Sequence, residues 1–115
     1  MSEPTALVIG EALVDVVRRR DGSVGEYAGG STANVAVALS RLGRPVHFVT
    51  AFTDDHFGGI VRKHLERDGV RFASDPVAID HTSSAVATIG EDGAASYVFD
   101  LEWRINDVTN PGEPC

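Results

Sequence analysis

The sequence predicts an α/β protein, because short apolar stretches typical of buried parallel strands alternate with amphipathic helices along its 115 residues. Thr5–Ile9 is such a stretch, and the β-forming run 46–52 follows a predicted helix and a short loop, as in a βαβ unit. Segments 13–28 and 84–100 each contain a turn typical of a β-hairpin. The expected fold is therefore a parallel sheet with helices, beside which two hairpins pair into a small second sheet.

The first hairpin directly follows the first strand. Its arms are the apolar residues of 13–17 and the segment Val24–Tyr27, and Asp21-Gly22 between them favours a two-residue turn. Because a hairpin does not fit within a purely parallel sheet, we expect this segment to project from it.

The stretch after this hairpin combines a glycine turn, a helix start and a helix stop. Gly29 and Gly30 permit backbone angles that other residues resist, and Ser31 and Thr32 are expected to cap the helix that follows. Gly43 ends it. The expected buried face consists of apolar residues at three- and four-residue steps, Val35, Ala38, Leu39 and Leu42.

Asn34 is a polar residue in the first turn of this predicted helix. It is either a helix-start asparagine or, together with the glycine turn, part of a site for a polar ligand, because its amide offers donors and an acceptor. The spacing matches neither common glycine-rich phosphate loop.

A second helix is predicted over His56–Asp68, with Gly69 as its stop. Asp54 and Asp55 precede it; a catalytic or metal-binding pair is the alternative, but helix capping explains them without chemistry. The expected buried face is Phe57, Ile60, Val61 and Leu65. A short strand over 70–72 should follow.

The second hairpin joins strands 84–89 and 95–99 through Glu91-Asp92-Gly93. Tyr97 and Phe99 alternate along its second strand, so they should share one face. Residues 105–115 read as a loop with no element after it.

Composition excludes several function classes. A net charge of −7 argues against nucleic-acid or anionic-membrane partners, and no apolar run approaches the roughly 20 residues that span a bilayer. The one cysteine, Cys115, and a first segment without the pattern of a secretory leader suit a reducing cytoplasm. No metal site is expected, because zinc-type spacing is missing among His47, His56, His64 and His81.

Asp15 interrupts an apolar run just past the first strand. Ligands of open α/β sheets bind beyond the carboxyl ends of strands, and a carboxylate there can accept hydroxyl hydrogen bonds from a sugar. An exposed aspartate on an alternating strand is the alternative interpretation.

Two motifs resemble the ribokinase-like (PfkB) carbohydrate kinases, most closely fructokinases. They are Gly10-Glu11-Ala12-Leu13-Val14-Asp15 and Gly29-Gly30-x-x-x-Asn34-x-Ala36-x-x-x-x-Arg41-Leu42-Gly43. The resemblance implies a three-layer α/β/α fold with a small β-sheet lid, transfer of the ATP γ-phosphate to a sugar hydroxyl, and Mg²⁺ as the metal. It also implies that the residues that bind the sugar are Asp15, Gly29, Gly30 and Asn34.

The same resemblance implies that the lid strands cover the sugar, with Tyr97 and Phe99 over one face, and that a homodimer can form through them. Members of this family are more than twice as long, and their catalytic aspartate motif and nucleotide pocket belong to a C-terminal half with no counterpart here. Residues 1–115 are therefore expected to be the N-terminal part of a kinase, with lid hairpins at 13–28 and 84–100. This part is expected to be inactive by itself.

Three alternatives stay open. The chain can be a complete, non-catalytic module that binds sugar or associates with itself, or half of a dinucleotide-binding domain. Within the kinase interpretation, ketodeoxygluconate, ribose and nucleosides are alternative acceptors to fructose.

Overall fold

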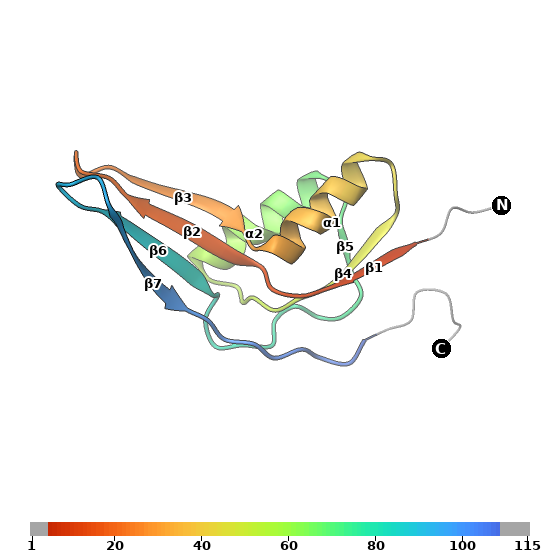
Figure 1. Ribbon diagram of the computed structural model, residues 1–115. Helices are drawn as coiled ribbons and strands as arrows, with labels where there is room; N and C mark the ends of the chain where they lie inside the picture. The colour runs from red at the N-terminus through yellow and green to blue at the C-terminus, as the bar shows by residue number, and fades with distance from the viewer. Residues whose placement is uncertain (1–4, 109–115) are drawn as a thin grey trace.

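The computed structural model describes residues 5–108, which form seven strands and two helices in two sheets (Figure 1). In chain order these are β1 Ala6–Ile9, β2 Leu13–Arg18, β3 Val24–Gly29, α1 Ser31–Arg41, β4 Val46–Val49, α2 His56–Arg67, β5 Arg71–Phe72, β6 Ser84–Ile89 and β7 Ala95–Asp100. The α/β fold class predicted from the sequence is confirmed.

One sheet is parallel, with strand order β1-β4-β5. Both helices lie on the same side of it in Figure 1, and α1 packs directly on β1 and β4. Of the three layers implied by the resemblance, the described residues thus supply the sheet and one helical layer. Leu7 and Ile9 point to the opposite side of β1, where they are 49% and 55% exposed.

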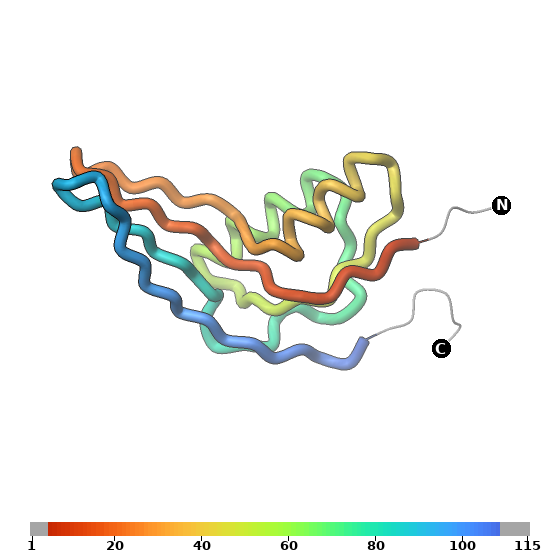
Figure 2. Tube along the Cα trace, in the orientation of Figure 1, coloured from red at the N-terminus to blue at the C-terminus, as the bar shows by residue number. Residues whose placement is uncertain are grey.

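The other sheet contains both hairpins, in the order β3-β2-β6-β7, which confirms the predicted second sheet. Its central pair, β2 and β6, is parallel, with Val14 opposite Ser84 and Arg18 opposite Thr88. Figure 2 shows this sheet projecting from the helices, with the two hairpin turns side by side at its far end.

The hydrophobic core lies between the sheets and the helices. The largest buried side chains include Phe48, Phe52 and Leu65, and Val14 and Val16 of β2 reach the same cluster. Because α2 packs against β2 and β3, the core is continuous from the parallel sheet to the four-stranded sheet.

The buried face predicted for α1 is largely wrong. Val35 is 49% exposed and Leu42 80% exposed, and of the predicted residues only Leu39 packs against the core. Instead, the helix buries the small face Ala33, Ala36 and Val37, one residue to the side. The small alanine side chains let the helix lie close to β1 and β4. The prediction failed because periodicity indicated a face that carries larger apolar side chains, and it contains no information about which face contacts the sheet.

For α2 the sequence prediction holds. Val61 and Leu65 are buried, Phe57 and Ile60 pack partly against the core, and Asp55 is the N-cap. The Asp55 carboxylate accepts the Gly58 N–H at 2.7 Å. It also accepts the Thr82 hydroxyl at 2.6 Å and the Thr82 N–H at 2.9 Å, so the cap ties α2 to the loop before β6.

The strand predicted over 46–52 is shorter than expected. β4 ends at Val49, and Phe52 forms a single bridge with Val77. The predicted loop continues to Cys115, but residues 109–115 lie outside the described part of the chain. No helix within residues 5–108 is long and apolar enough to cross a bilayer.

Replacing the α2 cap should destabilise the fold. Asp55→Ala removes three accepted hydrogen bonds, so we expect the free energy of unfolding to fall by about 1–3 kcal/mol in urea denaturation. Burial opposes ionisation of Asp55, but the hydrogen bonds from Thr82 and Gly58 outweigh it and lower its pKa. The stabilisation is therefore complete above the ordinary aspartate pKa and is lost as pH falls below about 4.

The neighbouring Asp54→Ala is the matched control. Its carboxylate is 77% exposed and makes one ion pair with Arg62 at 3.7 Å, so we expect a change within about 0.5 kcal/mol. Equal losses for the two variants would contradict the assigned cap.

Candidate functional site

Asp15 and Gly29, both predicted site residues, lie together in the structure. Leu13 pairs with Gly29 and Asp15 pairs with Tyr27, so Asp15 is the diagonal neighbour of Gly29 across β2 and β3. A Cβ atom on Gly29 would lie 2.3 Å from Asp15 Oδ2. The carboxylate therefore lies directly over the glycine, and a side chain at this position would displace it.

Asp15 lies on the face of the four-stranded sheet that points away from α2. Val14 and Val16 face the core, so the alternate residues of β2 face outward. The strand register places Asp15 opposite Tyr27 on one side and Ala85 on the other, and Ala85 opposite Phe99. We call this surface the open face; its larger side chains are Leu13, Asp15, Val17, Tyr27, Tyr97 and Phe99.

Aromatic rings stand on both sides of Asp15 on the open face. Tyr97 and Phe99 share this face, as the alternation predicted, and their rings stack at 6.1 Å with an interplanar angle of 11°. Both are 62% exposed. On the other side, the Tyr27 hydroxyl accepts a hydrogen bond from Arg19 at 2.7 Å. Because Ala85 lies between Asp15 and Phe99, little side-chain bulk separates the carboxylate from the ring.

The predicted capping of α1 by Ser31 and Thr32 is wrong. The N-cap is Gly30, which has φ 99° and no side-chain cap. The serine and threonine hydroxyls instead donate to Glu11, twenty residues earlier: Ser31 Oγ to Oε1 at 3.0 Å, and Thr32 Oγ1 to the backbone oxygen at 2.6 Å. A residue distant in sequence supplies the acceptors that a local cap normally provides.

Asn34 lies in the first turn of α1, where its backbone N–H donates to the Gly30 oxygen at 3.0 Å. Its side chain is exposed, on the side of the helix away from the buried alanines. The structure thus brings Asp15, Gly29 and Gly30 together and leaves the amide of Asn34 one turn away, facing solvent.

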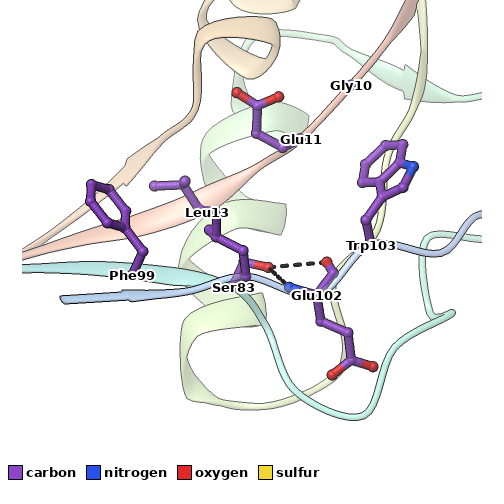
Figure 3. Close-up of a pocket in the computed structure, with 8 residues that line it drawn as sticks. Gly10, Glu11, Leu13, Ser83, Phe99, Glu102 and Trp103 are labelled. Carbon is purple, nitrogen blue, oxygen red and sulfur yellow. Dashed lines mark hydrogen bonds between the residues drawn. The ribbon is translucent and has the colours of Figure 1, made fainter.

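A groove of about 470 Å³ opens at the end of the open face nearest the parallel sheet (Figure 3). Its lining is mostly apolar and includes Leu13 and Phe99, which also belong to the open face. The complete lining is Gly10, Glu11, Leu13, Ser83, Phe99, Leu101, Glu102 and Trp103. Figure 3 shows Phe99 and Trp103 at opposite ends of the groove, with the Glu11 carboxylate above and the Glu102 carboxylate turned away below.

Hydrogen bonds hold the segment after β7, which forms one wall of this groove. Ser83 Oγ donates to the Glu102 oxygen at 3.2 Å and accepts the Glu102 N–H at 3.0 Å. His81 lies between two carboxylates, with Nε2 2.8 Å from Asp100 and Nδ1 3.1 Å from Glu102. These contacts fix residues 100–102 against the loop before β6.

Sequence reasoning missed Glu11 and Trp103. Glu11 stands within the first motif, and its signal was a charged residue directly after a strand-ending glycine. Trp103 had no local signal, because its role as a groove wall depends on β7 lying two strands from β2.

Comparison with known proteins assigns a family. Residues 4–110 match the family described as pfkB family carbohydrate kinase. A fructokinase from Rhizobium leguminosarum bv. trifolii is 39% identical over 99 residues, which cover 81% of this chain and 29% of that protein. A 5-dehydro-2-deoxygluconokinase from Photobacterium profundum is 36% identical over 86 residues, covering 69% of this chain and 25% of that protein.

Comparison with solved structures also finds a carbohydrate kinase. The structure of fructokinase with bound ATP from Xylella fastidiosa superposes with a TM-score of 0.69 and 35% identity, covering 83% of this chain and 30% of that one. The chain thus spans less than a third of the length of each of these three proteins.

The contacts of His81 with Asp100 and Glu102 should be detectable in solution as a raised histidine pKa. The hydrogen bond to Asp100, the charge of Asp100 and the charge of Glu102 raise the pKa of His81. We expect an NMR titration of the imidazole protons to show this elevation, and Asp100→Asn to return the pKa toward its ordinary value. The stabilisation from this contact is complete below the ordinary histidine pKa and is lost as pH rises through the raised one.

A His81 titration that does not respond to the substitution would contradict the contact.

Proposed function

Because this chain belongs to the pfkB family of carbohydrate kinases, we propose that it is the N-terminal part of an ATP-dependent, fructokinase-like enzyme that phosphorylates a sugar hydroxyl. The observation that carries the proposal is the Asp15 carboxylate seated over Gly29, between exposed aromatic rings and beside an apolar groove. Sugars have hydroxyl groups around their edges and apolar C–H faces. The carboxylate suits the hydroxyl groups, and the aromatic rings suit the apolar faces.

The proposed sugar site uses four residues in distinct roles. The Asp15 carboxylate accepts hydrogen bonds from two sugar hydroxyls, which are stronger than bonds to a neutral acceptor. Gly29 and Gly30 allow the sugar to approach the backbone, because neither presents a side chain. Asn34, whose amide is exposed, donates to a further hydroxyl. Tyr97 and Phe99 cover one sugar face as part of a lid.

The charges favour a neutral sugar over a sugar acid. The Glu11 carboxylate lines the groove and Asp15 lies next to it, whereas the Glu102 carboxylate turns away toward His81 (Figure 3). A carboxylate on the acceptor would lie near these like charges, which disfavours its binding. We therefore place fructose ahead of ketodeoxygluconate, with ribose and nucleosides as the other neutral acceptors.

The described residues do not fit the phosphates of ATP. The helix N-terminus closest to the proposed sugar site is that of α1, and the Glu11 carboxylate already occupies it and would repel an anion. We assign the ATP and Mg²⁺ sites, and the aspartate that takes the proton from the sugar hydroxyl, to the remaining C-terminal half of the kinase. The exposed Val35 and Leu42 on α1, and Leu7 and Ile9 on β1, are surfaces for that half to cover.

A non-catalytic, self-associating module is the second candidate. It is favoured by β3 and β7, which form the edges of the four-stranded sheet, and by the exposed aromatic residues of the open face. The same surface is where we propose that a kinase homodimer forms. Both candidates are compatible with a cytoplasmic protein.

The first test is an intact mass of the purified natural protein beside an ATP-consumption assay with fructose, ketodeoxygluconate, ribose and nucleosides. The kinase proposal expects a mass more than twice 12.2 kDa and turnover with fructose. A mass of 12.2 kDa without turnover would support the non-catalytic module instead.

The site assignment is tested in that kinase by Asp15→Ala. Loss of a charged hydrogen-bond acceptor should lower kcat/KM for the sugar about 10- to 100-fold while the KM for ATP stays the same. Gly29→Ala should act in the same direction, because its Cβ displaces the Asp15 carboxylate.

Glu91→Ala, at the exposed turn between β6 and β7, is the control and should leave kcat/KM unchanged. An Asp15→Ala enzyme with unaltered sugar kinetics would rule out the assigned site.

A further inference from the structure

We infer that Glu11 is a positioning residue: it bridges two neighbouring connections between the parallel part of the fold and the four-stranded sheet, fixes the glycine turn and thereby controls the affinity for sugar. The inference rests on the proposed function, but the bridge itself is a property of the described structure. It goes beyond the sugar contacts, because Glu11 acts through the turn.

Within the described residues the chain passes between the parallel part of the fold and the four-stranded sheet three times. Residues 73–83 join β5 to β6, and the other two passages lie next to each other. Residues 10–12 connect β1 to β2, and Gly30 connects β3 to α1. Neither connection belongs to a strand or a helix, although the Gly10 N–H donates to the Val49 oxygen of β4 at 3.1 Å. A contact that joins these two connections therefore adds to the packing of α2 on β2 and β3 in holding the four-stranded sheet on the helices.

Glu11 provides that join through its side chain and its backbone. Oε1 accepts the Ser31 N–H at 3.3 Å and the Ser31 hydroxyl at 3.0 Å. The Thr32 hydroxyl lies 2.6 Å from the Glu11 backbone oxygen and 3.4 Å from Oε2. One residue of the first connection thus holds the first two residues of α1.

Two glycines make this contact sterically possible. A Cβ on Gly10 would lie 2.2 Å from the Thr32 methyl group, and a Cβ on Gly30 would lie 2.9 Å from the Glu11 oxygen. Gly30 also has φ 99°, which other residues rarely adopt. The Gly30 backbone lies directly against the Glu11 backbone, and Gly10 leaves room for the Thr32 side chain, so a displacement of Glu11 is transmitted to the turn.

The charge of Glu11 strengthens the bridge. The first turn of α1 contains no acidic residue, and the helix dipole favours a carboxylate at this end. The backbone N–H of Glu11 itself and the Ser31 hydroxyl lower the pKa of the Glu11 carboxyl. At neutral pH the carboxylate is ionised and completes the helix start that Gly30, without a side chain, leaves open.

The glycine turn connects the Glu11 contacts to the proposed sugar site. Gly29, directly before the N-cap, is the residue under the Asp15 carboxylate, and Asn34 bonds through its N–H to Gly30. Loosening Gly30 therefore disturbs both sugar contacts at once. The Glu11 carboxylate is committed to Ser31 and Thr32, so it orients the site and does not itself bind the sugar.

The experiment compares Glu11→Ala, Glu11→Gln and Thr32→Val in the kinase that contains this chain. Glu11→Ala should raise the KM for fructose about tenfold or more, with kcat and the KM for ATP within about twofold of the wild type. Glu11→Gln keeps an acceptor for the Ser31 N–H and loses only the charge, so we expect a rise of about two- to fivefold. Thr32→Val keeps the side-chain size and should fall between them.

Amide hydrogen exchange of residues 30–34 gives a readout that does not depend on turnover. It should accelerate in the same order as the KM rises, whereas Glu91→Ala should change neither. Should Glu11→Ala fail to fold, Glu11→Gln and Thr32→Val carry the same comparison.

Three results would overturn the inference. One is unaltered exchange in all variants, and another is unaltered KM with accelerated exchange. The third is a fall in kcat at constant KM, which would place Glu11 at the reacting atoms. A wild-type kinase without turnover on any sugar would refute the proposed function alone, and accelerated exchange in Glu11→Ala would still support the bridge.

Discussion

The parallel pairing of β2 with β6 is the interaction on which the rest of this structure depends. It joins two hairpins that are far apart in the sequence, pairing Val14 with Ser84 and Arg18 with Thr88. A two-stranded hairpin alone is at best marginally stable in water, so neither hairpin is expected to persist without the other. The pairing also lets Val14 and Val16 bury against α2, which makes one continuous core.

The same pairing creates the candidate site. Asp15 and Phe99 come from different hairpins, and they share a face because β2 and β6 align in one register. A slip of one residue would turn Asp15 into the core and Val16 outward, which the burial of a charge forbids. The energetics of the core therefore fix the position of the proposed sugar-binding carboxylate.

Close approach at Gly10, Gly29 and Gly30 is the second constraint. A Cβ on Gly30 would strike the Glu11 backbone, whereas a Cβ on Gly10 or Gly29 would meet the side chains of Thr32 and Asp15. Surfaces without such contacts remain exposed, among them Val35 and Leu42 on α1 and Leu7 and Ile9 on β1.

The sequence by itself determined the α/β class, both hairpins, the α2 start at Asp55 and the pairing of Tyr97 with Phe99 on one face, because these depend on local turn chemistry and periodicity. Only the tertiary structure decided which face of α1 is buried, that Glu11 replaces Ser31 and Thr32 at its start, and that Trp103 lines a groove. Each of these depends on a partner far away in sequence. Propensity and spacing describe a residue's neighbours along the chain, but burial and hydrogen bonding are settled by neighbours in space.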